Sequence, residues 1–283
     1  MKKLLTTITL SALVGTSASN LKPVFTNSVV NNDFKSNIKL RVTNGTDVPE
    51  GKYAWFSSTN INLNLISPNW LLSAHHVFEG ATPKDIDRIE IEFKFYNQKN
   101  EIVVIKRKIK NFMTWANSKE PNWTHDIALV QLNKPIYDIK PISLYDKLEK
   151  PKTNTIATVI GKGVCGVDNN GNRIFPNKLQ EANIPILDDS VSKDPRWTFP
   201  NGWNPKTEIL AGIITGDKRI TAAPGDSGGP LFIKQNDKDV LVGIVSGAPV
   251  DNTEDNLIDP EPGVFTFVGA FYDWIKENTN NFS

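Results

Sequence analysis

Short apolar segments separated by polar turns recur from about residue 42 to the end of the chain. In "RIEIEFKF" (residues 88–95) apolar and charged residues alternate, which is the period of a half-buried β-strand. A helical period occurs only in "GAFYDWIKEN" (residues 269–278), where Phe271, Trp274 and Ile275 fall on one face. The pattern predicts a mainly β protein with a C-terminal helix. Further strands are expected in "NLNLIS" (62–67), "NWLLSA" (69–74), "EIVVIKRKIK" (101–110), "DIALVQL" (126–132), "TIATVIG" (155–161), "VLVGIVSG" (240–247) and "GVFTFV" (263–268).

The first 41 residues differ from this pattern. Two lysines followed by a dozen apolar residues, and then small residues up to Ala18, are typical of a signal peptide over residues 1–18. The apolar run is shorter than the roughly 20 residues that span a bilayer, so we expect a secreted, extracellular protein without a membrane anchor. Residues 19–41 are polar and are expected to form a pro-segment or a flexible linker.

The rest of the chain, residues 42–283, is long enough for one large domain or two closely packed halves. The polar, proline-containing stretch "YDKLEKPKTN" (residues 145–154) is the candidate link between an N-terminal half (42–148) and a C-terminal half (149–283). The 283 residues carry 32 basic and 31 acidic side chains, a net charge of +1. This balance argues against nucleic acid or an anionic membrane as the main partner.

Cysteine usage bears on the source of the chain. The single cysteine, Cys165, cannot form an internal disulfide and is interpreted as structural. Because secreted animal domains commonly carry disulfides, this composition favours a bacterial protein held together by packing.

Candidate chemistry begins with "GDSGGP" (residues 225–230), which precedes an apolar segment. Three glycines around Ser227 cost backbone entropy on folding. They form either a simple turn into a strand or a nucleophile loop with bare N–H groups for an oxyanion. A serine nucleophile needs a base, and the base needs a carboxylate to orient it. The chain has three histidines, His75, His76 and His125, and Asp126 follows the last of them.

These segments together resemble the chymotrypsin/trypsin family of serine endopeptidases over about residues 42–278. The resemblance rests on "RVTNG" (41–45), "NWLLSAHH" (69–76), "THDIAL" (124–129), "LQEANIPI" (179–186), "GDSGGP" (225–230), "LVGIVSG" (241–247) and "PGVFT" (262–266). Unrelated serine hydrolases carry their triad in a different chain order. The resemblance implies two packed antiparallel six-stranded β-barrels followed by a C-terminal α-helix, and peptide-bond hydrolysis through an acyl-enzyme.

The resemblance also implies roles for single residues. His76 would be the general base, with His75 in a position that the family usually fills with a small residue. Asp126 would orient His76, and Ser227 would attack the scissile carbonyl. The N–H groups of Gly225 and Ser227 would form the oxyanion hole.

In the family, the residue that precedes the nucleophile pairs with a new N-terminal amine. Here that residue is Asp226, and cleavage after Arg41 would free Val42 for the pairing. The family motif has two glycines where this chain has Asn44 and Gly45, and a linker ending in a strand is the alternative.

The resemblance places Thr221 on the floor of the substrate pocket and Gly263 in its wall. Ser246 would line the cleft and support Asp126, while Ala248 would narrow the pocket. Because no charged group is expected there, we expect an apolar or neutral residue before the cleaved bond. Cleavage after Arg41 would then need a separate activating protease.

No cofactor and no metal site is expected. Calcium bound by Asp251, Glu254 and Asp255 is an alternative, although their spacing is not that of an EF-hand. The expected partners are protein or peptide substrates and an activating protease, and the protein is expected to be a monomer.

Two other functions fit the sequence less well. An inactive homologue that serves as a secreted binding module usually lacks a triad residue, whereas this chain has all three. An esterase of the α/β type would carry Gly-x-Ser-x-Gly and alternating strands and helices, which are absent. The natural substrate, and a role in nutrition or in damage to a host, cannot be derived from the sequence.

Overall fold

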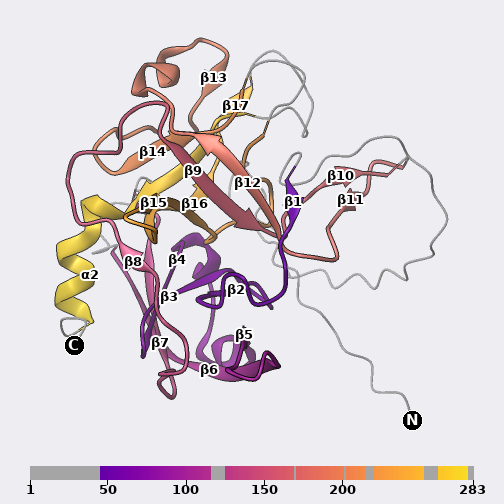
Figure 1. The fold of residues 1–283 in the computed structure, drawn as a ribbon. Coiled ribbons are helices and arrows are strands. Elements are labelled where there is room, and N and C mark those ends of the chain that lie inside the picture. Colours follow the sequence, from indigo (N-terminus) through magenta and orange to yellow (C-terminus); the bar gives the residue numbers. More distant parts are fainter. Residues whose placement is uncertain are drawn as a thin grey trace.

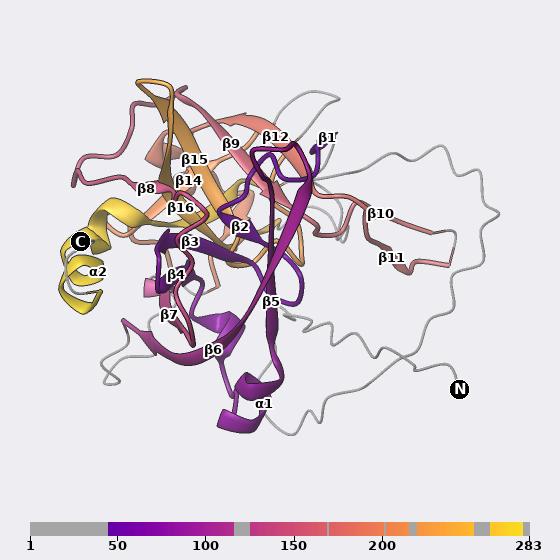
Figure 2. The ribbon, with the colours of Figure 1, turned by 60° about the horizontal axis from the view of Figure 1, so that its bottom comes forward.

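A computed structural model describes residues 45–115, 125–168, 170–200, 202–214, 220–251 and 261–279. The proposed signal peptide, the pro-segment, Arg41 and Val42 therefore lie outside the described residues. Figures 1 and 2 show two curled sheets, one built from the first half of the described chain and the other mainly from the second half.

The first sheet has six antiparallel strands in the order β2-β3-β4-β7-β6-β5. Its strand β5 confirms the alternation seen in the sequence, because Ile91 and Phe93 are buried while Glu90 and Lys94 are exposed. The strands are β2 (Phe56–Ser57), β3 (Leu63–Ser67), β4 (Trp70–Ser73), β5 (Glu90–Tyr96), β6 (Ile102–Thr114) and β7 (Ala128–Leu132).

The second sheet follows the order β1-β12-β9-β15-β16-β18-β14, and β8 pairs with β16 in parallel. Six of its strands form the second antiparallel barrel, and β1 and β8 add to it at β12 and β16. The predicted two-barrel fold class is thus confirmed. The strands are β1 (Thr46–Asp47), β8 (Ser143–Leu144), β9 (Ile156–Gly161), β12 (Gln180–Pro185), β14 (Glu208–Ala211), β15 (Pro230–Gln235), β16 (Lys238–Gly247) and β18 (Gly263–Phe267).

Among the described residues, two small strand pairs lie outside the barrels. One joins β10 (Gly166–Val167) to β11 (Arg173–Ile174), and the other joins β13 (Trp197–Thr198) to β17 (Val250–Asp251). The second pair ties together two segments that are far apart in the sequence.

Helices are few and short in the described chain. The C-terminal helix α2 (Tyr272–Asn278) follows a 3₁₀ turn, η4 (Val268–Phe271). Of the predicted face, Phe271 at the end of η4 and Ile275 in α2 are buried, and Trp274 is half-buried against the same core. Helix α1 (Pro83–Arg88) was not predicted, because six residues are too few for a periodic signal. Its signature is local instead, with a capping box between Thr82 and Asp85. The described residues also include the 3₁₀ helices η1 (His76–Phe78) and η3 (Asp189–Lys193).

Aromatic side chains pack between the two sheets. The ring of Phe232, on β15, meets Trp55 edge-on at 5.4 Å and Tyr53 at 5.3 Å between centroids. Each such contact contributes about 0.5–1.5 kcal/mol beyond its buried area. The core that contains Trp55 also includes Phe271 and Ile275, so helix α2 packs on the same core.

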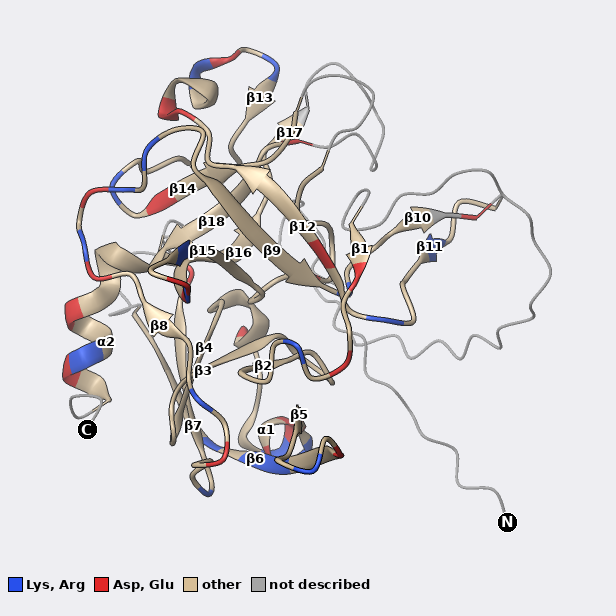
Figure 3. Cartoon of the chain, viewed as in Figure 1, with Lys and Arg blue, Asp and Glu red and all other residues tan. Residues whose placement is uncertain are grey.

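Charges of both signs are distributed over the described chain (Figure 3). Lys106, Lys108 and Lys110 of β6 are exposed, and Lys106 lies 2.7 Å from Glu90 and 2.8 Å from Glu92 of β5. None of the helices in the described ranges has the length and apolar character that a membrane crossing requires.

Candidate active site

The pairing of β4 with β7 brings His76 and Asp126 together. Ser73, at the end of β4, lies opposite Ala128, at the start of β7. His76 follows Ser73 by three residues and Asp126 precedes Ala128 by two, so the two side chains lie at the same end of adjacent strands. His76 Nδ1 is 2.6 Å from Asp126 Oδ2, and the His76 backbone N–H donates to Asp126 Oδ1 at 2.8 Å.

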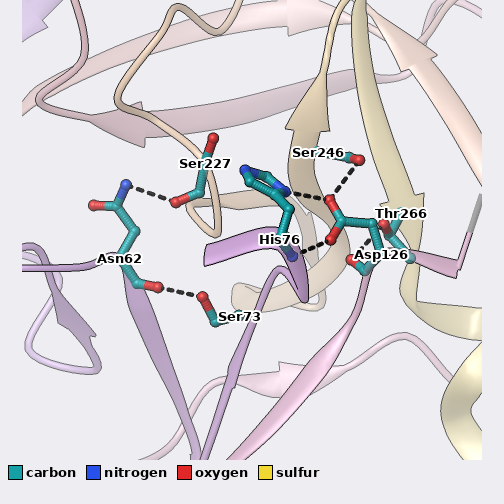
Figure 4. A network of polar contacts seen from close by, with 7 residues as sticks. All are labelled: Asn62, Ser73, His76, Asp126, Ser227, Ser246 and Thr266. Carbon is teal, nitrogen blue, oxygen red and sulfur yellow. Dashed lines mark hydrogen bonds and ion pairs between the residues drawn. The ribbon is translucent and has the colours of Figure 1, made fainter. Parts of the chain in front are cut away.

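The carboxylate of Asp126 is buried and held from the second barrel. The hydroxyl of Ser246, on β16, donates to Oδ2 at 2.7 Å, and Thr266, on β18, donates to the Asp126 carbonyl at 2.8 Å (Figure 4). The Asp126 carboxylate and carbonyl thus accept hydrogen bonds from three residues on two barrels. This fixes the position of the carboxylate before any substrate binds.

The environment of His76 has opposing effects on its pKa. Burial lowers the pKa, but the hydrogen bond to Asp126 and the negative charge of that carboxylate outweigh it, and the pKa of His76 is raised above 6.5. The Asp126 contact also favours the tautomer with the proton on Nδ1, which leaves Nε2 as the acceptor.

Ser227 lies in the loop before β15, on the side of the His76 ring that faces away from Asp126 (Figure 4). Ser227 is half-buried and Gly225 is exposed, so solvent reaches this loop. Gly225 and Gly228 have φ angles of +99° and +79°, in the region that favours glycine. Gly225 and Gly228 therefore adopt backbone conformations that residues with a Cβ rarely take.

Two N–H groups of this loop have no acceptor. Within residues 223–229, as part of the described chain, the N–H groups of Gly225 and Ser227 form no hydrogen bond. Pro224 has no N–H, and each of the other four backbone N–H groups donates a hydrogen bond. The Ala223 N–H donates to Asp226 Oδ2, and the N–H groups of Asp226, Gly228 and Gly229 donate to the carbonyls of Ala223, Val245 and Asp226, respectively. An unpaired pair of backbone donors beside a serine hydroxyl is what an oxyanion requires.

Asp226 is fully buried below the loop. Its carboxylate accepts the N–H groups of Gly163 at 2.6 Å and Ala223 at 2.9 Å, and no described cation lies within ion-pair distance. A Cβ on Gly161 or Gly163 would come within 1.9 or 2.6 Å of the Asp226 side chain, so both positions require glycine. Burial raises the pKa of Asp226 to about 6, although the two hydrogen bonds oppose the change.

Comparison with known proteins agrees with this geometry. The trypsin family model matches residues 42–275. The chain belongs to the trypsin family. It is 30% identical over 251 residues to mouse transmembrane protease serine 11C, covering 84% of this chain and 54% of that protein. It is 27% identical over 266 residues to mouse transmembrane protease serine 11G, covering 89% of this chain and 60% of that protein. It is 26% identical over 251 residues to human serine protease 56, covering 84% of this chain and 38% of that protein.

The chain spans about half the length of the curated relatives that it matches. The relatives are serine proteases from mouse and human, so the bacterial source suggested by the cysteine count stays a prediction. The family match and these relatives support classing the chain as a serine-type endopeptidase.

The structure of this trypsin-family chain brings together the residues expected to line the substrate pocket. Thr221 is buried, and a Cβ on Gly263 would lie 2.8 Å from its hydroxyl oxygen. Ser246 lies on β16 and the half-buried Ala248 follows it, while Gly263 starts the neighbouring strand β18. The four positions therefore gather at one end of the β16–β18 pair.

The other candidates are placed differently. His75 is half-buried and its carbonyl accepts the Phe78 N–H, whereas the His76 ring contacts Asp126. The ring of His125 stacks on Trp115 at 6.3 Å, and burial lowers the pKa of His125. Cys165 is partly exposed. Of the calcium candidates, Asp251 is in β17, and Glu254 and Asp255 lie outside the described residues.

Two buried asparagines next to the nucleophile loop were missed in the sequence. Asn62 and Asn64 belong to "NINLNL", where Asn62 immediately precedes the apolar strand β3 and Asn64 lies within it. Both are less than 7% exposed, and both donate to carbonyl groups of the loop around Ser227. The sequence signal that could have found them is the amide at two alternate positions of an apolar segment, because buried amides need fixed hydrogen-bond partners.

Proposed function

We propose that the chain is a serine endopeptidase that hydrolyses peptide bonds with Ser227 as nucleophile, His76 as general base and Asp126 as the residue that orients it. The main support for this proposal is that the 2.6 Å contact between His76 and Asp126 occurs together with a serine loop that has two unpaired N–H groups. Neither feature alone would define a reaction.

In this mechanism Ser227 Oγ attacks the carbonyl carbon of the scissile bond while its proton passes to His76 Nε2. The imidazolium that forms is stabilised by the Asp126 carboxylate. The oxyanion accepts the N–H groups of Gly225 and Ser227, and loss of one such donor typically costs about 3 kcal/mol. His76 then gives its proton to the leaving amine, and a water molecule, activated by the same ring, releases the acyl group from Ser227.

The proposed primary specificity is for an apolar or neutral residue before the cleaved bond. Thr221 is uncharged and is close to Gly263, and neither Ser246 nor Ala248 carries a charge that would select lysine, arginine or an acidic side chain. The methyl group of Ala248 would narrow the proposed substrate pocket, which favours smaller side chains.

Secretion and activation by cleavage belong to the same proposal. Removal of residues 1–18 would release the chain, and cleavage after Arg41 by another protease would free the Val42 amine. Support comes from Asp226, a fully buried carboxylate whose described partners are two uncharged N–H groups. A cation at this position would offset the cost of its burial.

The test is hydrolysis of a mixture of synthetic peptides, with the cleaved bonds read by mass spectrometry. We expect cleavage after apolar or neutral residues, and a loss of about 10⁶-fold in turnover in Ser227→Ala. Ser190→Ala is the matched control, since Ser190 is an exposed serine outside the site. Cleavage that survives in Ser227→Ala would refute the assignment, and a folded Val42 form without any cleavage would favour a binding homologue.

A further inference from the structure

Asn62 and Asn64 of the first barrel hold the nucleophile loop of the second barrel. Asn62 Nδ2 donates to the carbonyls of Gly225 and Ser227, at 3.0 Å each. Asn64 Nδ2 donates to the Gly228 carbonyl at 2.9 Å and to the Leu72 carbonyl of its own barrel at 3.0 Å. Two amides thus bind three carbonyl groups within four consecutive residues.

The contacts fix which end of each amide faces the loop. Each Nδ2 has two carbonyl oxygens within hydrogen-bond distance, so an oxygen in its place would face two other oxygens. Only a donor fits both positions. Figure 4 shows Asn62 between the Ser227 backbone and the first barrel, where its own carbonyl accepts the Ser73 hydroxyl at 2.7 Å.

The loop backbone is held by other contacts as well. A trans peptide is planar, so holding its carbonyl fixes the direction of its N–H. The Gly225 N–H shares its peptide with the Pro224 carbonyl, which accepts a hydrogen bond from the Val164 N–H at 2.8 Å. The Ser227 N–H shares its peptide with the Asp226 carbonyl, which accepts one from the Gly229 N–H, also at 2.8 Å. These bonds come from the second barrel. The carbonyls of Gly225, Ser227 and Gly228 belong to the neighbouring peptides, and it is these that the asparagines bind.

We propose that Asn62 and Asn64 are positioning residues for the reaction: they clamp the peptides around Ser227 across the barrel interface and so aim the Gly225 and Ser227 N–H groups at the oxyanion. This inference rests on the proposed function, and it adds two residues to it. Because the nucleophile loop belongs to the second barrel and His76 to the first, the clamp also holds the nucleophile in register with its base.

The close fit of the loop supports a positioning role. A Cβ on Gly228 would lie 2.3 Å from the Ser73 hydroxyl oxygen and 2.8 Å from the Asn62 carbonyl oxygen. The loop therefore sits directly against the end of β4, three residues before His76. A shift of the loop away from the asparagines would move the Ser227 hydroxyl relative to the His76 ring.

The experiment measures the second-order rate of labelling by a small fluorophosphonate, the final labelled fraction and the melting temperature. Asn62→Asp keeps the shape of the side chain but sets a carboxylate against two carbonyl oxygens. We expect the labelling rate to fall about 100-fold, the typical effect of a misplacement of roughly 1 Å, while the final labelled fraction stays complete. Asn64→Ala should slow labelling in the same way.

Asn60→Asp is the matched control, because exposed Asn60 also donates to a carbonyl, that of Glu90, but outside the loop. It should label at the wild-type rate. If Asn62→Asp fails to fold, Asn62→Ala and Asn62→Ser replace it. Wild-type labelling rates in folded Asn62 and Asn64 variants would overturn the clamp. A wild-type protein that is not labelled at Ser227 would instead refute the proposed function.

Discussion

The pH dependence of stability should reveal whether Asp226 acquires a cationic partner. A pKa of about 6 in place of the ordinary 3.8 means that ionising this buried carboxylate costs the fold about 3 kcal/mol. The stabilising effect of the neutral form is complete below pH 3.8 and is lost as the pH rises through 6. In a chain that cannot be cleaved after Arg41, the free energy of unfolding should therefore fall by about 2 kcal/mol between pH 4 and pH 7, because part of the effect lies below pH 4.

A chain that begins at Val42 should behave differently. If its ammonium group pairs with Asp226, the pKa of the carboxyl falls and the loss of stability between pH 4 and 7 disappears. Stability should instead decline above about pH 8, as the amine loses its proton. One extra glycine before Val42 displaces the ammonium, and this variant is expected to behave like the uncleaved chain.

The assay is urea unfolding at pH values from 4 to 9, with each free energy extrapolated to water. All chains carry Ser227→Ala to prevent self-cleavage. They also carry Glu208→Gln, because burial raises the pKa of Glu208 to about 7 and its titration would overlap. The same pH dependence in the Val42 chain and in an Arg41→Gln chain beginning at Ser19 would refute the pairing.

Four further predictions concern the site. The value of kcat/KM should rise with pH as His76 loses its proton, with a midpoint above 6.5, because Asp126 raises the pKa of His76; a midpoint below 6 would contradict this. Asp126→Asn should reduce kcat about 10⁴-fold at neutral pH by favouring the wrong His76 tautomer, measured with the best peptide substrate. Gly228→Ala should lower the melting temperature more than Gly80→Ala, since both have positive φ but only Gly228 has atoms within 4 Å of the new Cβ; equal losses would exclude the steric contact. Thr221→Asp should shift cleavage toward lysine and arginine, and an unchanged ratio of kcat/KM values for basic and apolar peptides would remove Thr221 from the pocket.

The proximity of His76 and Asp126 was predictable from the sequence because it follows from the pairing of two strands. Once the motifs around His76 and Asp126 are recognised as strand ends, an antiparallel pair brings them together, as β4 and β7 do. Ser227 required the resemblance, because its loop reaches the first barrel only through tertiary packing. The β5 alternation and the C-terminal helical face were also readable, since each rests on a local period.

The sequence could not reveal the contacts that depend on long-range register. Asn62 and Asn64 lie more than 160 residues from the loop carbonyls that they bind, and an amide side chain in the sequence does not indicate its partner. The same holds for Thr266, whose hydroxyl reaches the Asp126 carbonyl from a strand 140 residues later. Helix α1 was not predicted for a different reason, because its six residues have a capping box but are too few to show a hydrophobic period.

The most direct test of the central claim is mapping of the fluorophosphonate adduct by peptide mass spectrometry, in the wild type and in His76→Ala. The account predicts a single adduct on Ser227 in the wild type and little or no labelling in His76→Ala under the same conditions, because the hydroxyl then has no base. An adduct on another residue, or equal labelling of Ser227 without His76, would contradict it.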